Sequence, residues 1–522
     1  MGAQASRLLL NGRRDACVPV SKNETKNQPN AKLMKTKTTL LLSLACAALP
    51  RAEAAPANSA PVSTSARPNI IVILADDLGY GDLSCMYARD MRTPNLDKFF
   101  SEGVRMDNFY ANSSLCSPSR ASLLTGRYCD MAGVQGVIRN ESPGDYMNNF
   151  GYFKPGITVM PQVLKANGYA TALIGKWHLG YTSPNIPNER GFDLFKGILG
   201  GMMDDYYTHI RKGFPALRIN NDVCPKVEGH ITDILTNWAI DYTREQHAKG
   251  KPYFLYLAYN APHVPLHAPE DWVEKVKKRQ PGITDTRAHL VALIEHMDAG
   301  IGRLFDHLKK SGQWDNTFIV FTSDNGGFRG SEANNGPYRG YKSSMYEGGL
   351  RLPTAFFLKG RIEKRRSASI AQMMDIFPTI CDLLGINPGA DTTFDGISIL
   401  PALEGKKQVT DDRYFWYLVR EMGPTGNKLQ TAVRKGPYKL LQNMASEPYE
   451  FYDLSKDPAE EHPLKAGPKD KTYKDLFEQM RKRIACAGAV PWNIPADKYV
   501  DWTDMNEKLG LVRQGPVDTK KE

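Results

Sequence analysis

A cysteine followed four residues later by an arginine stands in an unusual string of small and polar residues. The string begins Cys116-Ser117-Pro118-Ser119-Arg120, continues Ala121-Ser122-Leu123-Leu124 and ends Thr125-Gly126-Arg127. We expect a helix to begin near Ser119, and the free N–H groups of its first turn would favour an anion beside Cys116. A lone cysteine near a proline would mean little, but a string of this length is hard to meet by chance.

Further polar residues follow predicted strands. Five apolar runs are typical of strands buried on both faces of a parallel sheet: Asn69–Leu74, Tyr169–Ile174, Tyr253–Ala258, Thr317–Thr322 and Thr354–Leu358. The first four are followed by Asp76 and Asp77, by Lys176 and His178, by His263, and by Asp324 and Asn325. Because open parallel sheets bind ligands at the carboxyl ends of their strands, we expect these side chains to meet at one sheet edge.

Four of these residues are hard oxygen donors, namely Asp76, Asp77, Asp324 and Asn325. Three carboxylates and an amide suit Ca²⁺, which takes about six to eight oxygen ligands in irregular geometry. Mg²⁺ is the second choice, and an oxygen-rich donor set disfavours zinc. Asp-Asp and Asp-Asn-Gly are also common turn sequences. A turn explains either pair alone, but not both pairs together with the string around Cys116.

Helical segments alternate with the predicted strands. One opens at Thr93-Pro94, another spans Thr158–Asn167 and stops at Gly168, and Arg287–Lys310 is long and amphipathic. The alternation predicts an α/β fold in which a large, mostly parallel sheet is sandwiched by helices. After about residue 405 the pattern changes to short alternating segments at 413–418, 431–434 and 438–441, followed by a helix at 476–484. We therefore expect a small C-terminal subdomain with an antiparallel sheet and a helix.

Several separated motifs resemble those of the type I sulfatases, which belong to the alkaline phosphatase superfamily, over roughly residues 68–463. In the family's order they are Ala75–Gly79, the string at Cys116, Gly175–Gly180, Pro262-His263, Ser323–Gly326 and Lys342 ahead of Tyr346–Gly349. The resemblance is closest to the arylsulfatases and N-acetylgalactosamine-6-sulfatases. It implies an alkaline-phosphatase-like fold and the hydrolysis of sulfate monoesters, most naturally on sulfated glycans or small sulfate esters.

The resemblance also implies a role for each motif. In that family the cysteine is oxidised to formylglycine (3-oxoalanine), so Cys116 would be the precursor of the nucleophile and would complete a metal site. The metal ligands would be Asp76, Asp77, Asp324, Asn325 and the modified Cys116. Arg120 would hold the aldehyde hydrate, while Lys176, His178, His263 and Lys342 would surround the sulfate. Conversion would need a partner, either a formylglycine-generating enzyme or an anaerobic maturase.

An aldehyde hydrate suits this chemistry because one hydroxyl can attack sulfur and the other can later expel sulfate. By resemblance, Lys176, His263 and Lys342 bind the substrate. We expect His263 to protonate the leaving alcohol and His178 to act as the base, since imidazole suits both tasks at neutral pH. Further candidates for the substrate cleft, for sugar hydroxyls or for a second anion are His267, Asp204, Asp205 and Arg329.

Two other functions remain open on the sequence. A phosphomonoester or phosphonate monoester hydrolase of the same superfamily can share the Cys-x-Pro-x-Arg motif, and phosphate is tetrahedral like sulfate. The Gly175–Gly180 motif and Lys342 favour a sulfatase. A non-catalytic binder of sulfated glycans would be expected to have lost Cys116, Arg120 or a metal aspartate, and all of these are present.

The beginning of the chain predicts export. Residues 34–54 combine a basic start, the apolar run Leu40–Leu49 and a cleavage site after Ala54, which is the pattern of a secretory signal peptide. We expect a secreted or periplasmic protein with its true start at Met34, so that residues 1–33 are an upstream extension. The remaining segments are a linker at 55–67, the sulfatase catalytic domain at 68–405, the C-terminal subdomain at 406–509 and a loose tail at 510–522.

Signals for membrane attachment are weak. The start Met1-Gly2 with Ser6 fits an N-myristoylation pattern, which makes little sense beside an internal signal peptide. A lipoprotein anchor at Cys46 is not expected, because Ser43 stands where a leucine is usual. The sequence has no run of about 18 or more apolar residues, so we expect no stable membrane span.

Charge and cysteine content narrow the choice of partners. The 522-residue chain has a net charge of +10, but residues 1–54 carry nine Lys or Arg against three Asp or Glu, which leaves about +4 for the rest. A mild positive excess suits an anionic substrate, and with no nucleic-acid-reading motif we expect no nucleic-acid partner. Six of the eight cysteines follow the signal peptide. One or two disulfides are allowed in an oxidising compartment, with their pairing open.

Overall fold

The structure is a computed structural model, and it describes residues 67–139, 152–406, 412–423, 426–444, 446–467 and 469–486. The predicted upstream extension, the signal peptide, the linker up to Ala66 and the tail 510–522 lie outside the described residues. Within the described ranges, no helix is long and apolar enough to cross a membrane.

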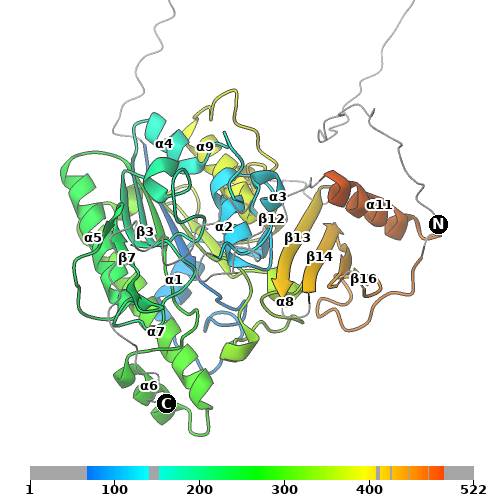
Figure 1. The fold of residues 1–522 in the computed structure, drawn as a ribbon, viewed down its shortest axis with the longest axis horizontal. Coiled ribbons are helices and arrows are strands. Elements are labelled where there is room, and N and C mark those ends of the chain that lie inside the picture. The colour runs from blue at the N-terminus through cyan, green and yellow to red at the C-terminus, as the bar shows by residue number, and fades with distance from the viewer. Residues whose placement is uncertain are drawn as a thin grey trace, which may run out of the picture. The chain divides into compact units, whose positions relative to one another are not determined.

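A mixed sheet of ten strands forms the larger part of the fold, with the order β12-β2-β11-β10-β1-β9-β3-β4-β7-β8 (Figure 1). Its middle strands run parallel: β10 (Thr317–Ser323), β1 (Asn69–Ala75), β9 (Tyr253–Ala258), β3 (Ala170–Lys176) and β4 (Leu194–Ile198). The outer strands are β2 (Val104–Tyr110), β7 (Leu217–Ile219), β8 (Asp222–Val223), β11 (Thr354–Phe357) and β12 (Arg365–Gln372). The predicted α/β fold around a large sheet is confirmed.

The strand predicted at residues 354–358 does not belong to the parallel block. β11 is antiparallel to both of its neighbours, β10 and β2. All four of its residues are nevertheless buried. An apolar run reports burial on both faces and carries no information on strand direction, so the mixed character of the sheet was missed.

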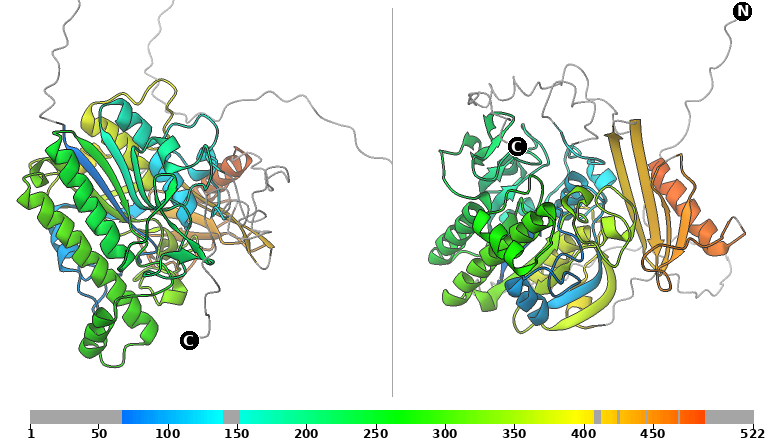
Figure 2. Two further views of the ribbon diagram at one scale, coloured as in Figure 1. Left: turned by 60° about the vertical axis from the view of Figure 1, so that its left-hand side comes forward. Right: turned by 90° about the horizontal axis from the view of Figure 1, so that it is seen from below.

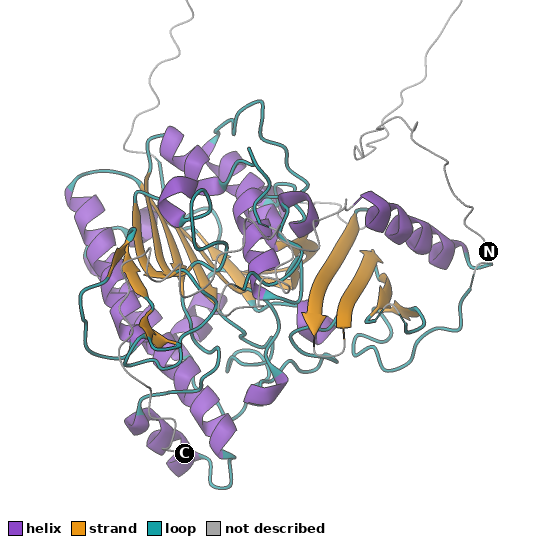
Figure 3. Ribbon diagram, in the orientation of Figure 1, coloured by secondary structure: helices purple, strands orange, loops and turns teal. Residues whose placement is uncertain are grey.

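Alternating side chains of β1 show why the sheet has helices on both faces. Ile71 and Ile73 lie in one hydrophobic core, while Ile70 and Val72 lie in another. The first core takes residues from α1 (Pro94–Glu102), α5 (Ile231–Ala248), α6 (Glu270–Arg279) and α7 (Asp285–Lys310). The second takes residues from α2 (Cys116–Thr125), α4 (Met160–Ala166), α9 (Ile376–Leu384) and α10 (Leu400–Leu403). Figure 3 shows the sheet between these two layers, and Figure 2 (left) shows the long green helices α5 and α7 on one face.

A second, antiparallel sheet follows in the chain. It consists of β13 (Tyr414–Gly423), β14 (Gly426–Lys435), β15 (Tyr438–Gln442) and β16 (Glu450–Asp453), and α11 (Lys471–Cys486) comes after it. Val433, Leu440 and Phe451 pack against Leu476 and Met480 of α11. Its other face packs against residues of the larger fold, among them Met345 and Leu350. The predicted small antiparallel sheet with a helix is therefore confirmed, whereas a domain boundary near residue 405 stays a prediction.

The short elements complete the described chain. They are α3 (Cys129–Ala132), α8 (Glu347–Leu350), the hairpin of β5 (Ile210–Arg211) and β6 (Phe214–Pro215), and single-turn 3₁₀ helices at Pro187–Arg190, Trp314–Asn316, Arg329–Ser331 and Met373–Asp375. The thiols of Cys85, Cys116, Cys129, Cys224 and Cys381 are free. None of these five cysteines forms a disulfide.

A buried cluster of charges joins the two sheets. Glu347 of α8 pairs with Lys439 of β15 at 2.9 Å, and Lys439 also pairs with Glu460 at 2.8 Å. Lys439 and Glu460 are fully buried, and Glu347 is almost so. Burial raises the pKa of Glu460 to about 7. Burial opposes ionisation of Glu347 too, but Lys439 and nearby arginines bring its pKa down to about 2.

Removing the cation of this cluster is expected to destabilise the fold. Lys439→Met leaves Glu347 and Glu460 buried without their shared partner, and breaking a buried ion pair typically costs about 3–5 kcal/mol. Urea unfolding followed by circular dichroism measures the change. The control is Lys456→Met, whose side chain is 82% exposed in its pair with Asp453, and which should shift the midpoint little. Equal midpoints for the two variants would contradict the structural role of the cluster.

Candidate active site

The carboxyl ends of four adjacent strands bring the predicted polar residues together. β10, β1, β9 and β3 are neighbours in the parallel block. Their ends are tied by backbone hydrogen bonds from Asp76 N to Ala261 O at 3.1 Å and from Asp324 N to Ala75 O at 3.2 Å. Residues far apart in the sequence therefore start the loops of one sheet edge side by side, as the strand pattern predicts.

The helix at Cys116 begins earlier than predicted. α2 starts at Cys116 itself, after the extended residue Leu115, and not near Ser119. Pro118 is tolerated because it lies in the first turn, where its missing N–H has no partner within the helix. Because the helix begins at Cys116, this residue lies at the positive end of the helix dipole. It also places Arg120 one turn later on the same face.

A buried ion network fixes the inner end of the site. Nε and Nη2 of Arg120 donate to Asp324 Oδ2 at 3.0 and 2.9 Å, and Nη2 lies 3.6 Å from Asp76 Oδ1. Lys176 Nζ donates to the other oxygen of Asp76 at 2.7 Å, while Arg120 Nη1 donates to Lys176 O at 3.1 Å. All four residues are fully buried. Charges this deep are stable only when paired, so each one holds its neighbours in place.

Asp77 organises the outer end of the site. Lys342 Nζ and Asn325 Nδ2 each donate to its carboxylate at 2.8 Å, and His263 Nε2 lies 3.7 Å from Asp77 Oδ2. Burial opposes ionisation, but Lys342 and His263 hold the pKa of Asp77 well below its usual range. Burial and the positive Lys342 lower the pKa of His263 to about 3. Asp77 also has a φ of 66°, a strained conformation for a residue with a side chain.

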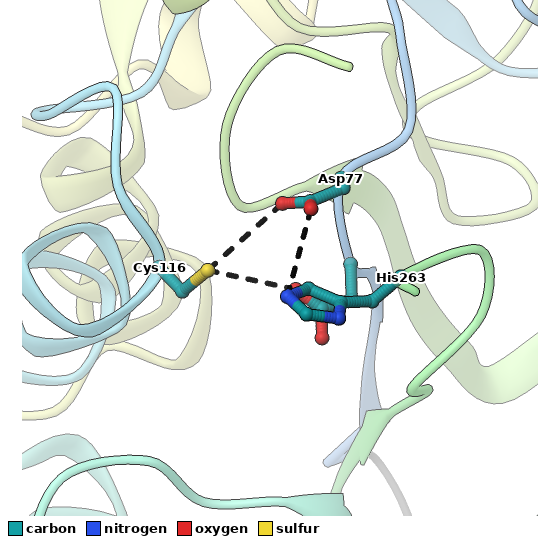
Figure 4. A group of neighbouring side chains, drawn as sticks. Asp77, Cys116 and His263 are labelled. Atoms are coloured by element: carbon teal, nitrogen blue, oxygen red, sulfur yellow. Dashed lines mark hydrogen bonds and ion pairs between the residues drawn. The ribbon is translucent and has the colours of Figure 1, made fainter. Parts of the chain in front are cut away.

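Cys116 faces the two aspartates of the first strand. Its Sγ lies 3.7 Å from Asp76 Oδ1 and 3.9 Å from Asp77 Oδ1, and Figure 4 shows it opposite Asp77 and His263. Burial raises the pKa of the Cys116 thiol to about 12, so the thiol is neutral at physiological pH. Burial together with nearby carboxylates raises the pKa of Asp76 to about 7. Burial is the main cause of both shifts, and the neighbouring carboxylates add to it.

The residues around Cys116 fit a cation. One potential ligand atom each from Asp76, Asp77, Cys116 and His263 lies within 4.8 Å of the others. In addition, Asn325 Oδ1 is buried and has no hydrogen-bond partner. A buried, unsatisfied oxygen costs about 1–3 kcal/mol, and a metal ion at this position would satisfy it. The donor set is rich in carboxylate and amide oxygen, as a hard divalent cation requires.

This geometric cluster differs from the predicted ligand set. His263 lies within it, whereas both carboxylate oxygens of Asp324 are engaged, Oδ1 by the N–H of Asp77 at 3.2 Å and Oδ2 by Arg120. The pairing of Asp324 with an arginine from α2 could not be read from the sequence. It depends on where the helix places Arg120 relative to the end of β10.

His178 is buried beside the pocket wall. Its Nε2 lies 3.1 Å from Ile138 O, while Nδ1 is buried without a hydrogen-bond partner. Burial, followed by the positive charges of Lys176 and Arg120, lowers the pKa of His178 well below its usual value. Its backbone has a φ of 59°. Gly201 packs against the ring so closely that a Cβ there would lie 2.6 Å from Nε2.

A pocket of about 450 Å³ opens onto these groups. Five of the predicted residues line it: Asp77, Cys116, His178, His263 and Lys342. Arg120, Lys176, Asp324 and Asn325 lie fully buried behind them. Arg139, Arg211 and Phe328 line the pocket too. These three residues were not predicted from the sequence, because they lie in loops and in a very short hairpin without a motif of their own.

The further cleft candidates lie elsewhere. His267 pairs with Asp205 at 3.0 Å, and Asp204 pairs with Arg211 at 2.7 Å. The described residues that line the pocket do not include His267, Asp205 or Arg329. Arg329 is exposed on the short helix that follows Phe328.

Two family models match the chain. The sulfatase model matches residues 68–386, and the model of the C-terminal part of N-sulphoglucosamine sulphohydrolase matches residues 338–488. The first covers the ten-stranded sheet with the pocket. The second covers the antiparallel sheet and α11.

Known proteins agree with these matches. N-acetylgalactosamine-6-sulfatase from Mus musculus is 33% identical over 394 residues, which cover 71% of each chain. Arylsulfatase G from Canis lupus familiaris is 30% identical and covers 80% of this chain and 85% of that one. The crystal structure of Ps i-CgsB in complex with k-i-k-neocarrahexaose superposes with a TM-score of 0.74 at 29% identity, and covers 84% of this chain and 97% of that one. The chain therefore belongs to the sulfatase family and is a sulfuric ester hydrolase.

Proposed function

We propose that this sulfatase hydrolyses sulfate monoesters of glycans by means of a formylglycine made from Cys116, with Ca²⁺ as the metal ion. The observation that carries the proposal is the position of Cys116. It lies at the first residue of α2, opposite Asp76 and Asp77, in the wall of a pocket lined by Lys342 and His263. No other cysteine among the described residues has such surroundings.

Two groups would complete the site. When present, the formylglycine hydrate would supply an oxygen nucleophile, and the divalent cation would neutralise negative charge on the oxygens around it. Asp76, Asp77, Asn325 and position 116 would hold the cation, with His263 or Asp324 beside it. Ca²⁺ is favoured because the donors are oxygens in an irregular arrangement.

The chain's own residues would bind and orient the ester. Arg120, fixed by its two bonds to Asp324, would stabilise negative charge at residue 116. Lys176 and Lys342 would neutralise the sulfate oxygens, and each is already held by an aspartate. These fixed positive charges do not need to reorganise during the reaction, which is the main source of electrostatic catalysis.

Proton transfer falls to the two histidines. His263 lines the pocket with its side chain 12% exposed, and there it would donate a proton to the leaving alcohol. Its pKa is lowered by burial and by Lys342, and the negative charge of a bound sulfate ester would raise it again. His178 is held from Ile138 O and by the contact with Gly201. In this position His178 would act as the base that takes the proton of the second hydroxyl at residue 116, and loss of this proton would release sulfate.

The glycan substrate is supported by the relatives. Those named above include an N-acetylgalactosamine-6-sulfatase and a structure solved with neocarrahexaose. The predicted signal peptide at residues 34–54 supports export from the cytoplasm, and sulfated polymers are found outside the cell. We propose that conversion of Cys116 requires a formylglycine-generating enzyme or an anaerobic maturase in the host.

Activity is expected to depend on Cys116 and to favour sulfate. Protein purified from its native host should contain the Cys116 peptide in the aldehyde form by mass spectrometry. It should also hydrolyse 4-nitrophenyl sulfate with a higher kcat/KM than 4-nitrophenyl phosphate or a phosphonate monoester. Cys116→Ala should lower kcat at least about a thousandfold, because it removes the nucleophile. Cys129→Ala removes another buried thiol and should retain activity.

Two results would contradict the proposal. Unmodified Cys116 in correctly exported, active protein would exclude formylglycine. A preference for the phosphonate ester would instead support the phosphonate hydrolase considered on the sequence.

Metal removal is expected to lower both activity and stability. Without a cation, the carboxylates of Asp76 and Asp77 and the Asn325 oxygen lose their shared partner. Dialysis against a chelator should therefore abolish hydrolysis of 4-nitrophenyl sulfate and lower the thermal unfolding midpoint. Ca²⁺ should restore both at lower concentration than Mg²⁺. The control is Asn325→Ala, in which the midpoint should respond less to added Ca²⁺. A midpoint that ignores both chelator and Ca²⁺ would argue against a metal at this site.

A further inference from the structure

Two arginines line the pocket without belonging to the group around Cys116. Arg139 directly follows Ile138, whose carbonyl contacts His178, and Arg211 belongs to the β5–β6 hairpin. The two residues come from separate segments of the chain. The lining of the same pocket also includes Met202, Val264 and Phe328.

Arg211 is held by a well-ordered hairpin. Lys212 and Gly213 have φ values of 50° and 86°, the conformation of a tight two-residue turn. Nη1 of Arg211 donates to Asp204 Oδ1 at 2.7 Å, and the backbone N–H of Lys212 donates to the same carboxylate. Asp204 N also donates to Ile210 O at 2.7 Å. The side chain is only 16% exposed, so the guanidinium is placed in the wall before a ligand arrives.

The cations at the inner end of the pocket are already paired. Lys176 and Lys342 are held by Asp76 and Asp77, and Arg120 is held by Asp324. Arg139 and Arg211 add two guanidinium groups to the lining of the pocket, and Arg211 is held by Asp204. A guanidinium matches a carboxylate or sulfate with two parallel hydrogen bonds, which a lysine cannot do.

Apolar residues share the lining of the pocket with the two arginines. Phe328 is 39% exposed, which is unusual for a large aromatic side chain in this protein, and it lines the pocket with Met202 and Val264. Aromatic rings offer a rigid contact surface at low entropic cost. A sugar ring has an apolar face and carries its anionic groups at the edge. An exposed aromatic ring and two arginines in one pocket therefore fit a sugar that carries a further anionic group.

We propose that Arg139 and Arg211 form an outer anion subsite that binds a second sulfate or carboxylate of the same glycan. Phe328 would contact the sugar between this group and the ester that is hydrolysed. The inference rests on the proposed function and deepens it. It narrows the substrate to glycans with at least two anionic groups, and excludes singly sulfated neutral sugars as the preferred substrate.

The subsite predicts a preference that can be measured by competition. The reporter reaction is hydrolysis of 4-nitrophenyl sulfate. The inhibition constants of four probes are compared: N-acetylgalactosamine 6-sulfate, N-acetylgalactosamine 4,6-disulfate, a disaccharide of the 6-sulfated sugar with glucuronate, and the methyl ester of that disaccharide. At least one doubly anionic probe should bind about tenfold more tightly than its singly anionic counterpart. Comparison of the disulfate with the glucuronate disaccharide shows whether the second anionic group that binds is a sulfate or a carboxylate.

Variants link the preference to the two arginines. In Arg139→Gln and Arg211→Gln, the ratio of inhibition constants should fall towards one, and Arg211→Lys should keep part of it because it retains the charge without the fork. Two control variants remove exposed charges nearby that do not line the pocket. Lys212→Gln removes a charge from the same turn as Arg211, and Arg329→Gln removes a charge next to Phe328. Both should keep the wild-type ratio. Thermal unfolding midpoints of all variants confirm that the ratio is compared between folded proteins.

Two outcomes would overturn the proposal. One is a ratio near one for every pair of probes in the wild-type protein. The other is an equal fall in Lys212→Gln, which would show general attraction of anions instead of a subsite. Failure of the proposed function is distinguishable, because 4-nitrophenyl sulfate would then not be hydrolysed. Calorimetric titration of the same probes into the same variants would still measure the ratio.

Discussion

The pairing of Arg120 with Asp324 and Asp76 is the interaction on which the site depends. Arg120 comes from α2, while the aspartates end β10 and β1, so the pairing locks a helix to the edge of the sheet. Lys176 at the end of β3 closes the network through Asp76. A buried charge without a partner costs free energy, whereas a fully paired network of buried charges holds its side chains in fixed positions. The position of Cys116, one turn before Arg120, follows from the same pairing.

The two hydrophobic cores make that pairing possible. Residues of β1 alternate between a core with α5 and α7 and a core with α2 and α9. The parallel strands therefore end at one edge, and only there do their loops leave the apolar layers. Polar residues placed directly after a buried strand can meet nowhere else. The strain at Asp77 and His178, both with positive φ, is tolerated because the packed strands before them cannot move.

This layout explains which features the sequence predicts. The runs at β1, β9 and β10 are mostly apolar, so the strands and the residues after them were identified correctly. The direction of the strands was not predicted correctly, because β11 is also mostly apolar but runs antiparallel to its neighbours. The start of α2 was placed too late, near Ser119, whereas the helix begins at Cys116 and accommodates Pro118 in its first turn. Arg139, Arg211 and Phe328 could not be found, because loop residues reach the pocket only through the folded chain.

The cluster of Glu347, Lys439 and Glu460 bears on how such proteins diversify. Glu347 directly precedes Gly348, which packs against the loop after Asn325: a Cβ on Gly326 would lie 1.9 Å from Gly348 O. Lys439 and Glu460 come from the antiparallel sheet and its following loop. A C-terminal part taken from another protein would remove the closest cation of Glu347 unless it brought an equivalent lysine, and would leave Arg351 of the larger fold at 3.6 Å. Recombination is therefore expected to favour exchange between chains that share this charged junction.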